Sequence, residues 1–350
     1  MDRLGSLCRP FLPVVLLLCA AGPLVSCSGG ECLASPSADG RTRLSVERQL
    51  MATLFRIDVI VDDATMGRQA IDAAFAEIEM AEGLLNNWDE SSQISELNRA
   101  AGVQPVVVSH ELMEVLQRAF EVAELTNGAF DISFASCGGL WSIRDRRIPS
   151  DQELESCLAH VDYRKVALDP VQQAVYISDP GTRLGIAGLA KGYRVDRAAR
   201  VLEDRGITDY VVDGGGDMRV STGSSRDSWP IQVAHPRRDT PLGTVGVSTG
   251  AIATSGDYEW FFEHGGVRYH HILDPATGYP ARKSTSATVI APSAVEADAL
   301  ATGLFVMGPR VGLALAEGLP GVEAMLIADD LSVHTTSGFP TVVVLGATGS

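Results

Sequence analysis

The sequence predicts an α+β fold with segregated helices and mostly antiparallel strands. Helical spacing of apolar residues dominates the chain up to Gly206, whereas strand-like patterns dominate from Tyr210 onwards. Helices and strands therefore do not alternate strictly, as they would in a doubly wound parallel sheet. The composition, 45% hydrophobic and 21% charged, is that of a globular protein, and 350 residues allow one large domain or two modest ones.

The first elements of the body follow from periodicity and capping residues. The segment "FRIDVIV" from Phe55 alternates like a half-buried strand, and the apolar residues after it recur at helical spacing as far as Leu85. A second helix is predicted to start at Ser109 and to end before Gly128. A short helix begins at Ser150, where a glutamate three residues later completes a capping box.

The second half is predicted to be richer in strands. "KVALD" and "AVYIS" are expected to form two strands, and a helix through Arg194 to Arg205 is stopped by Gly206. Mostly strands follow from Tyr210, interrupted by a helix after Ser293 and by another near Val311.

The N-terminus is typical of an exported protein. Two arginines precede the apolar run "FLPVVLLLCAAGPLV", which is too short for a comfortable membrane span. The run ends in "LVSC", which resembles the bacterial lipobox. We therefore expect residues 1–26 to be a lipoprotein signal peptide and Cys27 to carry a lipid that anchors the protein at the extracytoplasmic face of a membrane. The alternatives are an uncleaved anchor or plain secretion. Residues 27–45 are expected to be a flexible tether, followed by the folded body, residues 46–350.

Charge and cysteine content exclude two classes of function. A net charge of -16 would repel a nucleic-acid backbone, so we expect no nucleic-acid partner. Two of the six cysteines lie in the predicted signal peptide. A bridge between Cys137 and Cys157 is one option for the remaining thiols, and no Cys-x-x-Cys pair indicates structural zinc.

Two segments indicate a site for a metal ion and a phosphate group. In "PSAVEADALATGLFVMG" a capping box at Ser293 starts a helix that places Asp298 and Thr302 one turn apart on the same face, as two oxygen ligands suited to magnesium. Taken alone, such a pair is more often a solvated helix face. In "LGIAGLAKGYRVD" a glycine-containing turn enters a helix, which offers free N–H groups and the Lys191 ammonium to a phosphate. It is not a Walker motif, and a close contact between helix and strand is the alternative.

Further polar residues gather in three later segments. In "VVDGGGDM" two aspartates, Asp213 and Asp217, flank a glycine run that indicates either a tight turn or close backbone approach to a ligand. The segments "ATSGDYE" and "YHHILDPATGYP" add polar residues dense enough for a site, namely Ser255, Asp257, His270, His271 and Asp274. The chain has no Gly-x-Ser-x-Gly or His-Glu-x-x-His motif, which argues against a serine hydrolase or a zinc peptidase.

Taken in order, these segments resemble the ApbE family, the FAD:protein FMN transferases. The resemblance runs from about Met51 to Gly308 through eight segments: "MATLFRIDV", "WDESSQISELN", "TNGAFDIS", "GLAKGYRVDRA", "DGGGD", "ATSGDYEWFF", "HHILDPATGYP" and "VEADALATGLFVMG". It implies that residues 46–350 form a single flavin transferase domain.

The resemblance also implies roles for individual residues. Magnesium would be held by Asp298, Thr302 and the backbone carbonyl of Gly188. Contacts to FAD would come from the positions Met51, Trp88, Ala129, Phe130, Asp131, Lys191 and Ile272. The catalytic residues would be His271 and Asp298. The chain departs from the family at Gly185, where an acidic residue that contacts the flavin is usual.

The reaction implied is magnesium-dependent transfer of FMN from FAD to a Ser or Thr hydroxyl of an acceptor protein, through a phosphoester bond and with release of AMP. His271 would orient or deprotonate that hydroxyl. The family's acceptor motif resembles Asp-x-x-Ser/Thr-Gly-Ala-Thr, which the C-terminal "LGATGS" completes only in part, so the acceptor is expected to be another protein, such as a subunit of a membrane redox complex. The alternatives are an FAD pyrophosphatase, against which Trp88 argues, and a flavin-binding lipoprotein without catalysis.

Overall fold

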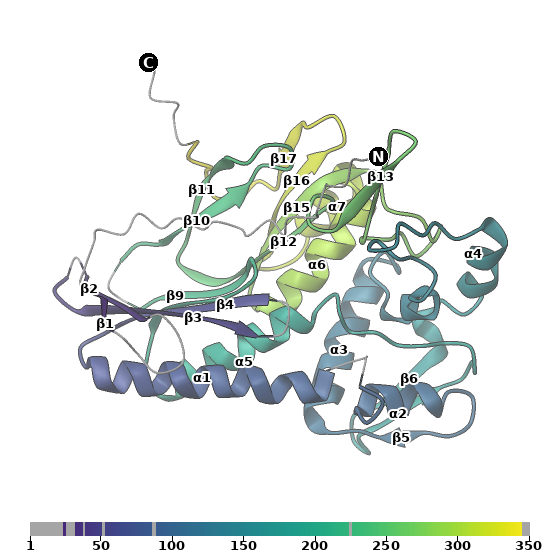
Figure 1. The fold of residues 1–350 in the computed structure, drawn as a ribbon, viewed down its shortest axis with the longest axis horizontal. Coiled ribbons are helices and arrows are strands. Elements are labelled where there is room, and N and C mark those ends of the chain that lie inside the picture. The colour runs from purple at the N-terminus through teal and green to yellow at the C-terminus, as the bar shows by residue number, and fades with distance from the viewer. Residues whose placement is uncertain are drawn as a thin grey trace, which may run out of the picture.

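The computed structural model describes residues 24–25, 32–37, 39–50, 53–85, 89–223 and 226–344. Its centre is a ten-stranded sheet with the strand order β1-β2-β3-β4-β8-β9-β12-β15-β16-β17, in which every neighbouring pair is antiparallel (Figure 1). The predicted α+β class with mostly antiparallel strands is therefore confirmed.

The strands of the large sheet are β1 (Leu24–Val25), β2 (Cys32–Pro36), β3 (Thr42–Leu50), β4 (Thr53–Val61), β8 (Asp209–Gly214), β9 (Asp217–Thr222), β12 (Thr249–Gly256), β15 (Ser284–Ala291), β16 (Glu323–Ala328) and β17 (Val333–Thr335). Three small sheets are formed by β5 (Val106–Val107), β6 (Val166–Asp169) and β7 (Ala174–Ile177), by β10 (Trp229–Ala234) and β11 (Pro241–Val247), and by β13 (Phe261–His264) and β14 (Val267–His270).

The α-helices are α1 (Ala64–Leu85), α2 (Gln93–Arg99), α3 (His110–Leu125), α4 (Asp151–Leu158), α5 (Ala190–Asp204), α6 (Ala294–Met307) and α7 (Pro309–Ala316). Two 3₁₀ helices, η1 (Ile132–Cys137) and η2 (Tyr163–Lys165), lie between α3 and β6. The predicted caps are confirmed at Ser109 and at Ser150, where both halves of the capping box form.

One predicted helix start needs correction, and a second is confirmed with an addition. The helix expected from Arg194 begins four residues earlier, at Ala190, because a contact from another helix replaces its missing side-chain cap, as described below. At the start of α6, Ser293 accepts a bond from the N–H of Glu296, as predicted, but further N–H groups of that turn donate to Asp196 of α5. A tertiary contact of this kind leaves no local pattern in the sequence.

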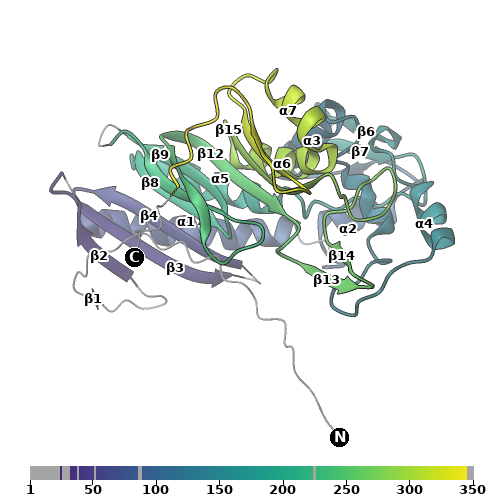
Figure 2. The same cartoon turned by 90° about the horizontal axis from the view of Figure 1, so that it is seen from above.

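Two apolar cores cover the two faces of the large sheet. The main core joins one face to α1, α3, α5 and α6, and it contains Phe55, Phe75 and Phe305. On the other face, a smaller core lies under the β10–β11 hairpin around Trp229 (Figure 1). In both views β2 and β3 lie at one end of the molecule and α4 at the other, with the β13–β14 hairpin on the α4 side of the centre (Figure 2).

The expected flexible tether over residues 27–45 is corrected by the structure. Within that range, β2 pairs with β3 from Cys32↔Val46 to Pro36↔Thr42, so residues 32–36 and 42–45 belong to the sheet. The polar and glycine-rich composition indicated a linker, but backbone pairing to a neighbouring strand does not depend on apolar side chains. Cys27 lies outside the described residues.

Candidate functional site

The N-termini of α5 and α6 meet and cap each other. From α6, the Asp298 carboxylate accepts a hydrogen bond from the Gly192 N–H of α5 at 3.1 Å. From α5, the Asp196 carboxylate accepts bonds from the N–H groups of Ala294 and Val295, both at 2.9 Å. A Cβ at Gly192 would lie 2.2 Å from the Ala294 carbonyl oxygen, so glycine permits this approach. The contact fixes Asp298 against the start of α5, which is a favourable place for anions.

The side chain of Lys191 lies among carboxylates. Its Nζ is 2.6 Å from Oδ2 of Asp217, a residue only 1% exposed. Asp217 is the first residue of β9, directly after the two-residue turn Gly215–Gly216, in which both glycines have positive φ. The sequence left open whether this glycine run is a turn or a ligand contact. The structure forms the turn, and the turn places Asp217 beside Lys191.

Asp298 and Asp217 form a carboxylate pair next to this ammonium. Asp298 is 6% exposed. Burial and the adjacent Asp217 carboxylate raise the pKa of Asp298 well above its usual range, against the opposing effects of Lys191 and the Gly192 N–H. Although burial disfavours the charged form of Lys191, attraction to both aspartates outweighs it and raises the pKa of the ammonium. Glu259 also lies within electrostatic reach of Lys191. The cluster thus holds three carboxyl groups around one ammonium.

The two other predicted metal ligands lie at the borders of this cluster. Thr302, one turn beyond Asp298 on α6, has its Oγ1 3.2 Å from the Ser255 Oγ of β12. Gly188 lies just before α5, in a loop that is held by Asn98. The Asn98 amide donates to the Leu184 carbonyl at 2.9 Å and accepts from the Leu184 N–H at 2.7 Å. The "SELN" segment thereby positions the turn that carries Gly188 and Lys191.

The two adjacent histidines have different environments. His270 is buried, and its Nδ1 accepts from the Ile272 N–H at 3.3 Å while its Nε2 lies 2.8 Å from the Ala281 carbonyl oxygen. These bonds require the neutral Nε2–H tautomer and give His270 a structural role. The His271 side chain is exposed. The surrounding protein, with His270 and Lys191, lowers the pKa of His271 below the usual imidazole range, so His271 is the histidine available for proton transfer.

Of the other predicted flavin contacts that the structure describes, Phe130 lies against Gly188. Phe130 is buried, and one of its ring carbons would lie 3.1 Å from a Cβ built at Gly188. Asp131 uses its carboxylate to accept bonds from the N–H groups of Ser133 and Tyr163, so its side chain already has a structural role. Ala129 is partly buried beside Phe130, and Ile272 is buried in the main core.

Of the positions Gly185, Met51 and Trp88, the structure describes only Gly185. The departure from the family pattern, Gly185, donates its N–H to the Ile132 carbonyl at 2.9 Å and so lies against η1, one residue from Asp131. Met51 and Trp88 lie outside the described residues. Their predicted contacts with FAD stay predictions.

Of the further polar residues named from the sequence, Asp217 belongs to the cluster, and Ser255 and His271 border it. Asp257 pairs with Arg237 at 2.6 Å, and Asp274 accepts from the Ala276 N–H in its own turn. The sequence did not predict the roles of Asp196 and Asn98. The local signal for each is its place in a segment that resembles the family, "GLAKGYRVDRA" for Asp196 and "WDESSQISELN" for Asn98.

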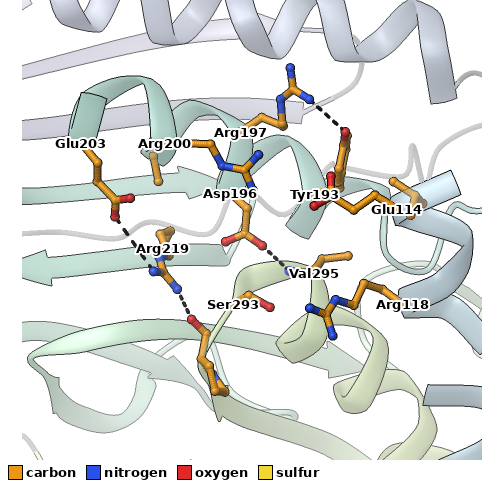
Figure 3. A pocket seen from close by; sticks show the side chains of 13 residues that line it. Glu114, Arg118, Tyr193, Asp196, Arg197, Arg200, Glu203, Arg219, Ser293 and Val295 are labelled. Carbon is orange, nitrogen blue, oxygen red and sulfur yellow. Dashed lines mark hydrogen bonds and ion pairs between the residues drawn. The ribbon is translucent and has the colours of Figure 1, made fainter. Parts of the chain in front are cut away.

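The described part of the chain has a pocket of about 230 Å³ elsewhere, between α3, α5 and the start of α6 (Figure 3). Its lining includes the side chains of Arg118, Tyr193, Arg197 and Arg219. Figure 3 shows Arg197 bonded to Tyr193, and Arg219 to the backbone before α6. None of the predicted site residues lines this pocket.

The described residues lack two features, a carboxylate-, histidine- or cysteine-based metal cluster and a membrane-spanning helix. No group of three or more His, Cys, Asp and Glu side chains there is arranged to hold a metal ion. A magnesium site would therefore need hydroxyl and backbone oxygens in addition to the carboxylates. No helix within the described ranges is long and apolar enough to cross a membrane.

Comparison with known proteins identifies the family of this site. Residues 51–326 match the model of the ApbE family. The chain belongs to the ApbE family. The match contains the elements that carry the cluster, namely α5, β9, β12 and α6.

Individual ApbE proteins agree with this assignment. The FAD:protein FMN transferase of Treponema pallidum (strain Nichols) is 32% identical over 338 residues, which cover 90% of this chain and 91% of the relative. The crystal structure of the ApbE protein from Thermotoga maritima has a TM-score of 0.77 at 32% identity and covers 84% of this chain and 97% of its own. The structure of the flavin transferase ApbE from Vibrio cholerae has a TM-score of 0.74 at 29% identity and covers 85% of this chain and 98% of its own. The resemblance seen in the sequence and the single-domain α+β fold are confirmed.

Proposed function

We propose that this protein is an FAD:protein FMN transferase, which moves FMN from FAD to a Ser or Thr hydroxyl of an acceptor protein. The observation that carries the proposal is the position of Lys191. Its ammonium lies at the start of α5, beside the carboxylates of Asp217 and Asp298, and it is close enough to lower the pKa of His271. A group that binds a pyrophosphate and a group that takes a proton thus lie together, as group transfer from FAD requires.

The charge of the cluster supports a divalent cation. Asp217, Asp298 and Glu259 surround the single ammonium of Lys191, and two of the three carboxylates are buried. An anionic pyrophosphate would be repelled by this arrangement unless positive charge were added. The donors present are oxygens, which suits magnesium. We propose that Asp298, Thr302 and the Gly188 carbonyl hold it, and that magnesium supplies charge neutralisation at the phosphates.

The chain's own residues then have distinct tasks. Lys191 and the free N–H groups of the first turn of α5 bind the pyrophosphate. His271 accepts the proton of the acceptor hydroxyl. The hydroxyl oxygen forms a bond to the phosphorus of the FMN half as the bond from that phosphorus to the AMP phosphate oxygen breaks. The products are a phosphoester on the acceptor, AMP and a proton on His271.

The test is a paired assay with two acceptor peptides. The protein is incubated with FAD, magnesium and a peptide that carries a target Thr, or the same peptide with Ala in its place. We expect peptide-bound FMN and AMP in equal amounts with the Thr peptide only. FMN and AMP released equally with both peptides would identify a pyrophosphatase instead. FAD binding without AMP release would identify a non-catalytic flavin-binding protein.

We propose in addition that the protein is exported and anchored by a lipid on Cys27, and that its acceptor is a redox-complex subunit at the same membrane. The apolar run followed by "LVSC" supports this placement. A lipid anchor would keep enzyme and acceptor within reach of each other, which raises their effective concentration.

A further inference from the structure

One large aromatic side chain is exposed next to the site. Trp260 is 63% exposed, and no other Phe or Trp in the described ranges is exposed to a comparable degree. Tryptophan is enriched at protein interfaces, where its large ring supplies contact area at a low cost in side-chain entropy. A tryptophan that no part of the described chain covers therefore marks a surface suited to a partner.

The backbone register sets Trp260 opposite His271. In the β13–β14 hairpin, Phe261 pairs with His270. The His271 N–H donates to the Trp260 carbonyl at 3.1 Å, which extends this ladder by one pair. Residues directly opposite each other on antiparallel strands carry their side chains on the same face. The side chains of Trp260 and His271 therefore lie on the same face of the hairpin.

The hairpin that follows Trp260 is packed by aromatic side chains. Phe262 and Tyr269 stack with ring centroids 5.2 Å apart, and Trp141 packs against Tyr269 at 5.8 Å. The Trp141 indole N–H donates to the Gly278 carbonyl at 2.8 Å, which ties the hairpin to the next turn. A surface that is ordered before binding loses little entropy when a partner docks.

An exposed cation lies beside the same hairpin. The Ala281 N–H donates to the Ile272 carbonyl at 3.0 Å, so Arg282 comes alongside His271. The guanidinium of Arg282 lies 5.9 Å from the ring centroid of Tyr269, and it forms no ion pair with a carboxylate of the described residues. In a protein of net charge -16, a free cation at this position favours a partner segment that carries a carboxylate.

We propose that Trp260 and Arg282 form the docking surface for the acceptor protein, and that they bind an extended, acidic segment that flanks the target hydroxyl. This inference rests on the proposed flavin transfer. The ring of Trp260 packs against the acceptor backbone next to the hydroxyl, while Arg282 pairs with an acceptor carboxylate. Both residues select the acceptor and take no part in binding FAD.

The first test replaces the aromatic ring. Trp260→Ala should raise KM for a Thr acceptor peptide about tenfold, while kcat and the Kd for FAD stay at parent values, and Trp260→Phe should recover most of the loss. Met80→Ala is the matched control, because Met80 has the same exposed fraction of 63% on α1. A weakened Kd for FAD with an unchanged acceptor KM would assign Trp260 to the flavin site and overturn the proposal.

The second test exchanges charges. The variant Arg282→Glu should bind a peptide with Asp near its target Thr more weakly than the parent protein does. It should bind the same peptide with Lys in place of that Asp more tightly than the parent protein does. If the Lys peptide binds the variant no better, Arg282 does not contact the acceptor.

Peptide binding is measured by fluorescence anisotropy without FAD, and transfer is measured separately. A parent protein that binds the peptide without transferring FMN would contradict the proposed function and leave the docking surface supported. A parent protein that transfers FMN with no dependence on Trp260 or Arg282 would contradict the docking surface alone.

Discussion

At the scale of single residues, the central feature is that Asp298 has two tasks. Its carboxylate caps α5 through Gly192, and it is the single carboxylate of the proposed metal ligand set. Asp298→Ala should therefore abolish AMP release and weaken magnesium binding by at least about 100-fold, measured by titration calorimetry in the absence of FAD. Chelation of the parent protein should stop transfer as well. Full transfer in excess EDTA would eliminate the metal from the mechanism.

The environment of His271 predicts how the rate of FMN transfer depends on pH. From the sequence alone, an unperturbed imidazole would titrate at about 6.5, but the structure lowers the pKa of His271 through the surrounding protein and the charges of His270 and Lys191. A proton acceptor must be neutral, so a lowered pKa keeps it active at more acidic pH. The transfer rate should fall only as pH drops through this lowered pKa, well below 6.5.

The control for this pH profile is the variant His271→Ala. It should lose about 10²–10⁴-fold in single-turnover transfer and keep FAD binding, because the imidazole is proposed to act on the acceptor hydroxyl alone. His264→Ala, at an exposed position on the same hairpin, should transfer like the parent. Parent-like transfer by His271→Ala would remove this residue from the mechanism.

Asp217 is the residue whose role the structure changes most. The sequence placed it only at the edge of a glycine turn, whereas its carboxylate fixes the Lys191 ammonium. Asp217→Asn should raise KM for FAD about tenfold, the equivalent of one charged hydrogen bond, by releasing Lys191 from its position. Asp213→Asn is the matched control, because Asp213 flanks the same turn and its Oδ1 accepts from the Gly216 N–H, which an amide oxygen can also do. Equal effects of both changes would mean that only the turn matters.

At the scale of elements, the sequence predicted what local patterns encode. Apolar periodicity and capping residues located α1, α3 and α4, and an aspartate and a threonine one turn apart pointed to α6 as the helix of the site. Local patterns in the sequence could not predict that the starts of α5 and α6 cap each other, because Asp196 and Ala294 are far apart in the chain. The disulfide between Cys137 and Cys157, left open from the sequence, forms in the structure for the same tertiary reason.

The contact between α5 and α6 predicts that a larger residue at Gly192 lowers the stability of the fold. At Gly192 a methyl group would lie 2.2 Å from the Ala294 carbonyl oxygen, and backbone cannot move aside as a flexible side chain can. Gly192→Ala should lower the free energy of unfolding by about 1–3 kcal/mol and should also displace Asp298. Gly139→Ala is the control, since a Cβ there meets nothing within 4 Å. Equal midpoints of urea unfolding for the two variants would show that the helices can separate without cost.

At the scale of the whole molecule, the two halves have different tasks in the proposed arrangement. The β13–β14 hairpin, which the docking surface adjoins, lies in the half of the molecule away from β2 and β3 (Figures 1 and 2). Because β2 begins at Cys32, four residues lie between Cys27 and the sheet, and the five residue-to-residue steps span at most about 18 Å. Cleavage before Cys27 would also remove β1 and leave β2 as the edge strand. The folded body would then be held close to the membrane at its β2 end, with the docking surface in the other half of the molecule.

This arrangement predicts that Cys27→Ser separates membrane attachment from catalysis. The variant should be exported and recovered in the soluble fraction, since the proposed anchor is a single lipidated cysteine. Its transfer of FMN to a soluble peptide should equal that of the detergent-solubilised parent, because the substituted residue is far along the chain from His271 and Trp260. Transfer to an acceptor embedded in the same membrane should fall, because tethering no longer raises the effective concentration of enzyme and acceptor. Fractionation, soluble-peptide assays and assays with membrane vesicles measure the three outcomes. A variant that stays in the membrane fraction as fully as the parent contradicts the lipid anchor, and unchanged transfer in vesicles contradicts the role of tethering.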